Sequence, residues 1–208
     1  MLRGPKSKRR DEVSEKKMQY YETYKGLYHG TTREYATKIL HEGFCPSEHG
    51  WLGPGIYFYD IRSKAFWSAE RTCARLKEET GIKPEKAVLC CNIDQVNRQY
   101  VMDLRDWSAI AEFGEYVDEK LSHNTLEFSD TFGMEEEEFK RALLIATYAD
   151  EKEKKLIIGT FEQREQEKAK KGLHYAREFK LIAGVETIYC ARDPELINDL
   201  KLSTYCEN

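Results

Sequence analysis

Apolar and aromatic runs alternate with amphipathic runs along the N-terminal half of the chain. Short strands are predicted in 26–31 (GLYHGT) and 55–60 (GIYFYD), the second opened by a turn at 53–55. Helices are predicted in 33–44 (REYATKILHEGF) and 63–81 (SKAFWSAERTCARLKEETG), because apolar residues recur there at the spacing of one helix face. These helices should end at Gly43 and Gly81. The first should place Tyr35, Ile39 and Leu40 on one face.

The C-terminal half continues the alternation. Helices are predicted in 106–121, with Asp106 as its capping residue, and in 134–149, which begins with acidic residues. A short helix capped by Asp193 is predicted in 193–200, and 162–172 reads as a polar connection or a helix. Further strands are predicted in 86–94, 100–104, 153–161, 177–183 and the segment that starts at Glu186. Strands at both ends with helices between the early ones indicate an α+β fold.

The domain organisation follows from length and polarity. Residues 1–20 are polar and mixed in charge, and are interpreted as an N-terminal arm. Residues 21–208 should form a single domain, because a chain of 208 residues can bury a core without a metal or disulfide staple. The apolar content is 40% and the charged content 34%, which describes a polar globular protein rather than a disordered one.

Charge, cysteine spacing and hydropathy exclude several classes of protein. The net charge of −4 argues against a generally basic nucleic-acid binder. The six cysteines form no C-x-x-C pair and have no histidine rhythm around them, so we expect reduced thiols and no metal site. No apolar run has the length of a membrane span and no signal peptide is visible, which favours a cytoplasmic protein without membrane contact.

Three motifs, taken in their order, carry the chemistry. The first is YHGTT at 28–32, the second GPGIYFYD at 53–60, and the third VETIYC at 185–190. Together they resemble the ADP-ribosyltransferases related to poly(ADP-ribose) polymerases and diphtheria toxin, described by a His, Tyr, Glu triad. The resemblance is strongest over 26–70 and 183–200. It implies an ADP-ribosyltransferase fold of two packed, mainly antiparallel sheets with flanking helices.

The resemblance also implies roles for individual residues, with NAD⁺ as the substrate and no metal. His29 would bond the adenine-side ribose, and the backbone of Gly30 would hold the nicotinamide amide. Thr31 would add a hydroxyl contact, and Tyr57 would line the nicotinamide ribose pocket and stack on the ring. Glu186 would bond the ribose and stabilise an oxocarbenium-like transition state. Glu178 and Glu195 are its rivals for that role.

The chain departs from the family pattern in two places. Where many relatives have a serine and then a stacking tyrosine on the second helix, this sequence has Ala65 and Ser68. Trp67, Phe66 or Tyr59 would then supply the stacking surface. Gly184 stands two residues before Glu186, so the paired acid of the arginine-modifying branch is missing.

The resulting expectation is a mono-ADP-ribosyltransferase that moves ADP-ribose from NAD⁺ to a macromolecular acceptor, either a protein or RNA or DNA. A bacterial toxin or defence effector, controlled by an antitoxin or inhibitor protein, is the biological role that the resemblance implies. The alternatives are an NAD glycohydrolase, the tRNA 2′-phosphotransferase branch of the same fold, and a non-catalytic module that binds NAD or ADP-ribose.

Overall fold

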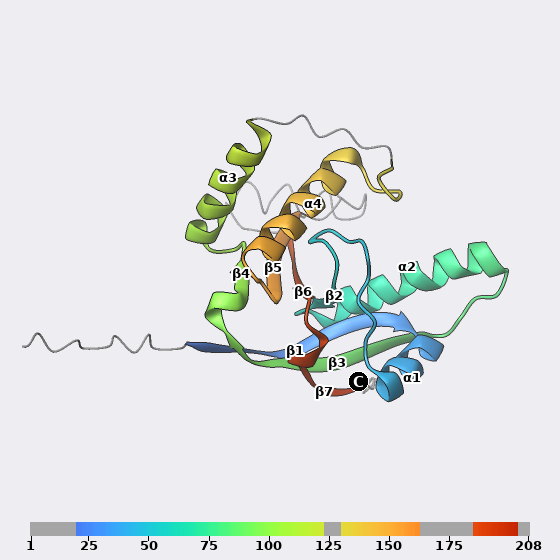
Figure 1. Ribbon diagram of the computed structural model, residues 1–208. Coiled ribbons are helices and arrows are strands. Elements are labelled where there is room, and N and C mark those ends of the chain that lie inside the picture. The colour runs from blue at the N-terminus through green and yellow to red at the C-terminus, as the bar shows by residue number, and fades with distance from the viewer. Residues whose placement is uncertain (1–19, 123–129, 163–184, 204–208) are drawn as a thin grey trace, which may run out of the picture.

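The described part of the chain is a mixed α+β structure built on one sheet (Figure 1). A computed structural model describes residues 20–122, 130–162 and 185–203. The strands are β1 (Tyr21–Thr32), β2 (Ile56–Tyr59), β3 (Lys86–Asn97), β4 (Val101–Asp103), β5 (Leu156–Glu162), β6 (Val185–Ala191) and β7 (Ile197–Leu202). The α-helices are α1 (Arg33–Glu42), α2 (Arg62–Thr80), α3 (Trp107–Leu121) and α4 (Glu136–Glu151).

The sheet has the order β4-β5-β6-β2-β1-β3-β7. Its neighbouring strands are antiparallel except for β4 and β5, which are parallel. The predicted α+β class and mainly antiparallel pairing are therefore confirmed. The described strands belong to a single seven-stranded sheet, however, and not to the two packed sheets that the resemblance implies.

The two halves of this sheet meet at a narrow junction. Within the described residues, β1 and β2 are joined by one register pair, Tyr28 opposite Tyr59, whereas β1 and β3 pair from Tyr21 to Thr32. Figure 1 shows β2, β5 and β6 running steeply across the direction of β1 and β3. The sheet bends at this junction, and its halves enclose a shared apolar core that includes Leu27, Cys91, Ile93, Phe58, Ile158 and Tyr189.

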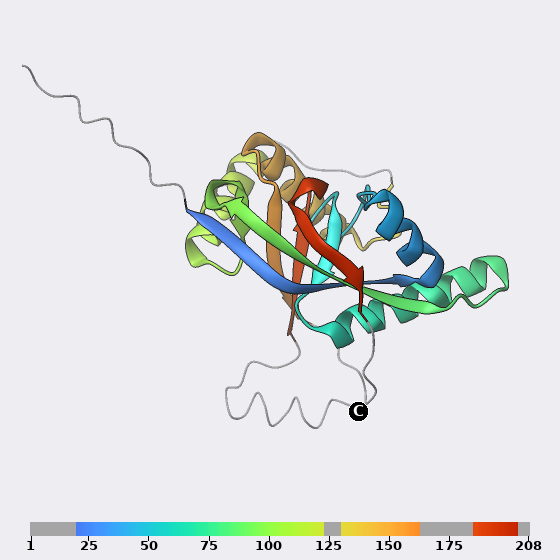
Figure 2. The same cartoon turned by 90° about the horizontal axis from the view of Figure 1, so that it is seen from below.

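The helices cover different faces of the sheet. α2 lies along β1 on the face that points away from the shared core, and α1 packs through Ala36 and Ile39 on the face toward that core (Figure 2). A second core lies between the β4-β5-β6 half and the helices α3 and α4, and contains Ile157, Ile188, Cys190, Ile145 and Tyr148. We call the face toward the shared core the inner face and the opposite one the outer face.

Most predicted boundaries are confirmed at their caps. Gly43 and Gly81 end α1 and α2, each with a positive φ, and Asp106 accepts the amide hydrogen of Ser108 at the start of α3. The predicted apolar face of α1 is wrong in part. Its buried stripe is formed by Ala36 and the partly buried Ile39, while Tyr35 and Leu40 are 46% and 41% exposed.

The segment after β6 is the main local correction. Asp193 caps a turn at Pro194–Leu196 by accepting the amide hydrogen of Glu195, as predicted, but the helix stops there. Ile197–Leu202 forms the edge strand β7 against β3 instead. Its apolar residues gain more contact as a strand, because Ile197, Leu200 and Leu202 pack against the core beside β3.

The predicted strand 177–183 and the segment 163–172 lie outside the described residues. Among the described helices, none is long and apolar enough to cross a membrane.

Candidate functional site

His29 sits where β1 and β2 begin to separate. Its Nδ1 lies 2.8 Å from the backbone oxygen of Tyr57. A carbonyl oxygen can only accept, so Nδ1 carries the hydrogen and donates it. Burial lowers the pKa of His29 against a smaller raising effect of this hydrogen bond, which keeps the ring neutral at neutral pH. The other ring nitrogen, Nε2, is then an acceptor.

A cavity of about 550 Å³ opens beside this histidine. It lies between α1 and the start of β2, and His29, Thr31 and Tyr57 contribute to its lining. Lys38 and Glu42 of α1 add charged groups to its wall, and Tyr35 adds an exposed aromatic ring. The cavity therefore combines apolar walls with a few polar groups, as small-molecule sites commonly do.

Tyr57 contacts two different parts of the site. Its carbonyl oxygen faces His29, whereas its ring packs on the outer face among the residues of the second core. The hydroxyl accepts the amide hydrogen of Leu52 at 3.1 Å and donates to the carbonyl oxygen of Gly53. Burial raises the pKa of Tyr57. A Cβ on Gly50 would overlap the Tyr57 ring, so a glycine there allows the turn 50–53 to cover it.

Gly30 is explained by packing without reference to a ligand. A Cβ at this position would overlap the carbonyl oxygen of Ala65 and lie 2.8 Å from the amide nitrogen of Ala69. Only a glycine lets α2 approach β1 this closely. Ala65 itself is fully buried in that contact, which accounts for a small residue at a position where relatives of the resembled family have a serine.

Glu186 is a buried carboxylate on the outer face of β6. It is 6% exposed and stands directly opposite Phe161 of β5. Register and alternation place it on the same face as Tyr57 and Tyr59, because Cys190 pairs with Tyr57 and Ile188 pairs with Tyr59. Burial raises the pKa of Tyr59, the hydrogen bond of Tyr59 to Ser68 opposes this, and the nearby Glu186 charge adds a smaller raising effect.

The predicted site residues are thus divided between the two faces of the sheet. Tyr57, Tyr59 and Glu186 project from the outer face, and His29 and Thr31 from the inner face. The Tyr57 carbonyl links the two groups, at the place where β1 and β2 part. Of the two rivals of Glu186, Glu195 is exposed beyond the end of β6 and Glu178 lies outside the described residues.

The aromatic residues proposed to cover nicotinamide differ in position. Trp67 is 37% exposed on α2 and stacks with Arg71, whose guanidinium carbon is 4.9 Å from the ring centroid. Phe66 contacts the ammonium group of Lys86. Neither ring lines the 550 Å³ cavity. Tyr59 lies nearer to Glu186, because it interacts with both Ser68 and Glu186.

Sequence reasoning missed Arg141 on α4. Its guanidinium carbon lies 5.0 Å from the ring centroid of Phe161, the residue that pairs with Glu186. Its Nε is buried and has no hydrogen-bond partner among the described residues. A single arginine within a run of helix-forming residues gives no sign in the sequence that its guanidinium will lie against Phe161. The contact depends on how α4 packs over β5.

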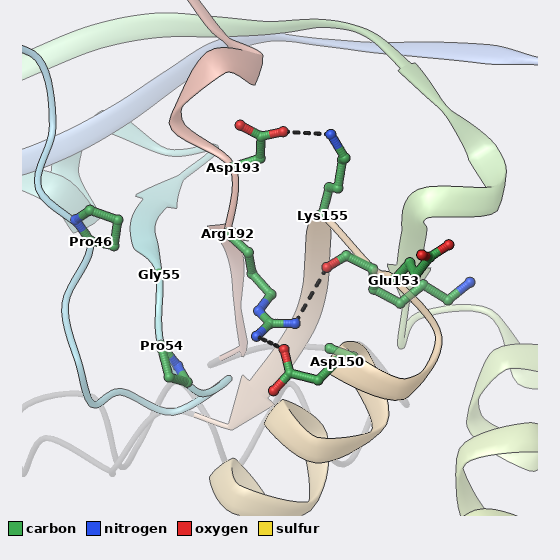
Figure 3. A pocket seen from close by; sticks show the side chains of 10 residues that line it. Pro46, Pro54, Gly55, Asp150, Glu153, Lys155, Arg192 and Asp193 are labelled. Atoms are coloured by element: carbon green, nitrogen blue, oxygen red, sulfur yellow. Dashed lines mark hydrogen bonds and ion pairs between the residues drawn. The ribbon is translucent and has the colours of Figure 1, made fainter.

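A second cavity, of about 340 Å³, lies near the C-terminal end of α4 (Figure 3). Four of its charged side chains form two ion pairs. Arg192 contacts Asp150 at 2.6 Å, and Lys155 contacts Asp193 at 2.7 Å. These ion pairs connect α4 and β5 to the end of β6, which is a structural role.

Among the described residues, no group of three or more His, Cys, Asp or Glu side chains is arranged to hold a metal ion.

Comparisons with known proteins add one relative. The chain is 38% identical over 76 residues to the protein MJ0359 of Methanocaldococcus jannaschii, which is described only as uncharacterized. The matched stretch covers 34% of this chain and 35% of that protein. No family model and no solved structure matches the chain.

Proposed function

We propose that the chain is an NAD⁺-dependent mono-ADP-ribosyltransferase. The observation that carries this proposal is the arrangement around Tyr57. A neutral histidine that binds its carbonyl lines a cavity on one face, and the buried carboxylate Glu186 lies on the other face beside Tyr59. A dinucleotide has two ends that can be recognised separately. The candidate residues lie on two faces of the sheet, where β1 and β2 separate. Such a site suits an extended ligand with two ends better than a compact ligand.

Each group has a chemical role in this proposal. Nε2 of His29 accepts a hydrogen bond from a ribose hydroxyl, because Nδ1 is already committed to Tyr57. Glu186 is positioned in a buried environment, where a negative charge stabilises a developing cation more strongly than it would in water. Tyr59 and Ser68 orient the ligand next to that carboxylate.

The reaction breaks the bond between ribose C1′ and the nicotinamide nitrogen, and the electron pair leaves with neutral nicotinamide. A nucleophile on the acceptor forms the new bond to C1′ and loses its proton to Glu186. Because nicotinamide leaves as a neutral molecule from a cationic one, the chemistry needs no general acid. It needs a fixed substrate and a carboxylate near the ribose.

The acceptor is proposed to be a macromolecule, protein or nucleic acid. The test uses purified protein with NAD⁺ labelled in its adenylate part, mixed with a cell extract and then treated with protease or nuclease. Label that protease releases identifies a protein acceptor, and label that nuclease releases identifies a nucleic acid. Free ADP-ribose as the only product identifies an NAD glycohydrolase instead, and binding without turnover identifies a binding module.

Glu186→Gln tests the catalytic assignment. We expect it to lower the rate of nicotinamide release by about a hundredfold or more while the fold is retained. Glu195→Gln is the matched control, since it makes the same change at an exposed glutamate nine residues further along the chain. Full activity in Glu186→Gln would overturn the assignment.

A further inference from the structure

Arg141 has a buried hydrogen-bond donor that is not used within the described part of the molecule. Its Nε is buried and has no partner there, and the contact it does make is with the face of the Phe161 ring. An arginine has five N–H donors, and a buried one that stays unpaired costs free energy. Arg192, by contrast, is bound by Asp150. Arg141 therefore has a buried donor that no acceptor among the described residues satisfies.

The surroundings of Arg141 connect it to the candidate site. It projects from the first half of α4 toward β5, where its guanidinium lies over Phe161. Phe161 and Glu186 are direct partners in the antiparallel pair β5–β6, so their side chains project from the same face. The positive charge of Arg141 also acts on the Tyr57 hydroxyl, against the larger effect of burial. Arg141 thus shares the outer face with Tyr57 and Glu186.

We propose that Arg141 binds a phosphate group of the ligand that occupies the outer face beside Glu186. A guanidinium presents parallel N–H donors that match two oxygens of a phosphate, and such charge-assisted bonds are about twice as strong as neutral ones. The contact with the Phe161 ring restricts the guanidinium, so that the ligand does not have to order a free side chain.

Opposite charges on one face describe the ligand further. Glu186 favours a positive or electron-poor centre, and Arg141 favours an anion. A ligand that meets both carries a phosphate next to a cationic centre. This identification rests on the proposed function, in which the ligand is NAD⁺ and the phosphate belongs to its pyrophosphate bridge. The anion-binding role of Arg141 by itself does not depend on turnover.

The test measures equilibrium binding to the full chain with four probes: inorganic pyrophosphate, ADP-ribose, NAD⁺ and nicotinamide riboside, which has no phosphate. Arg141→Gln removes the charge, and Arg141→Lys keeps the charge without the parallel N–H donors of the guanidinium. Arg75→Gln is the matched control, because Arg75 is an exposed arginine far along α2. Circular dichroism and thermal unfolding establish that each variant is folded.

We expect Arg141→Gln to weaken the binding of the three phosphate-bearing probes by about tenfold or more. Arg141→Lys should lie between it and the unsubstituted chain, and nicotinamide riboside and Arg75→Gln should show no change. Equal binding of pyrophosphate and ADP-ribose by Arg141→Gln and the unsubstituted chain overturns the inference, even if the chain turns over NAD⁺. Pyrophosphate binding that depends on Arg141, without any binding or turnover of NAD⁺, supports the anion site and rejects the proposed function.

Discussion

His29 of β1 donates a hydrogen bond to the backbone oxygen of Tyr57 in β2, next to the pair Tyr28 and Tyr59 that joins the two halves of the sheet. This bond therefore does two things. It ties the halves together where the backbone ladder has ended, and it fixes the tautomer in which Nε2 is an acceptor, the atom proposed to bind the ligand. The two roles use different nitrogens, so substitution can separate them.

Replacing His29 with asparagine should weaken ligand binding more than stability. An asparagine amide can donate near the position of Nδ1, but has nothing in the place of Nε2. We expect His29→Asn to keep most of the free energy of unfolding, and His29→Ala to lose about 2 kcal/mol of it. Both should weaken NAD⁺ binding. Urea unfolding and NAD⁺ titration of the same two samples measure this, and equal stability of the two variants would contradict it.

The pH dependence of stability follows from the lowered pKa of His29. In the unfolded chain the ring takes up its proton near its usual value of 6.5, and in the folded protein only at lower pH. Between these two values the unfolded chain binds more protons, so the free energy of unfolding falls as the pH decreases below 6.5. Urea midpoints between about pH 7.5 and pH 5 measure this fall. His29→Asn should make it shallower, and an unchanged slope would exclude His29 as its source.

Gly30→Ala should destabilise the protein strongly, because its Cβ has no room against Ala65 and Ala69 of α2. We expect a loss of about 3 kcal/mol in the free energy of unfolding. Gly114→Ala is the control. Gly114 lies within α3 with open space around it, so the same substitution should raise stability by about 1 kcal/mol. Thermal and urea unfolding of both variants compare them, and a neutral Gly30→Ala would refute the close contact between β1 and α2.

Tyr57→Phe should loosen the turn 50–53 that covers the ring. It removes the acceptor for the Leu52 amide and the donor to the Gly53 carbonyl, at a partly buried position. We expect a loss of about 1.5 kcal/mol, together with faster hydrogen exchange at the Leu52 amide. Tyr35→Phe, at an exposed tyrosine, should change stability by less than about 0.5 kcal/mol. An unaltered exchange rate at Leu52 would show that the hydroxyl does not hold the turn.

The local elements were predictable because their signals are local. The glycine caps at 43 and 81 and the Asp106 and Asp193 caps are set by neighbouring residues, and the structure has each of them. Periodicity also located the two early strands and the long helix α2 between β2 and β3. The edge strand β7 was missed, because a capped start with proline at the first position resembles a helix until β3 offers a partner.

The site was predicted less completely than the elements. The motifs contained His29, Tyr57 and Glu186, but their division between two faces depends on strand register, which no single segment encodes. The single sheet could not be predicted for the same reason. Only the pair between Tyr28 and Tyr59 joins the two groups of described strands into one sheet. Arg141 depends on the packing of one helix over a strand.

The sheet can bend most easily at the narrow junction between its two halves. A change in the angle between the β1-β3-β7 half and the β2-β6-β5-β4 half strains this one rung and the hydrogen bond between His29 and Tyr57, while the long pairing of β1 with β3 and of β5 with β6 is unaffected. Movement at that rung would shift His29 relative to Glu186 and leave each within its own rigid half. The spacing between the candidate residues of the two halves can therefore change at the cost of few hydrogen bonds.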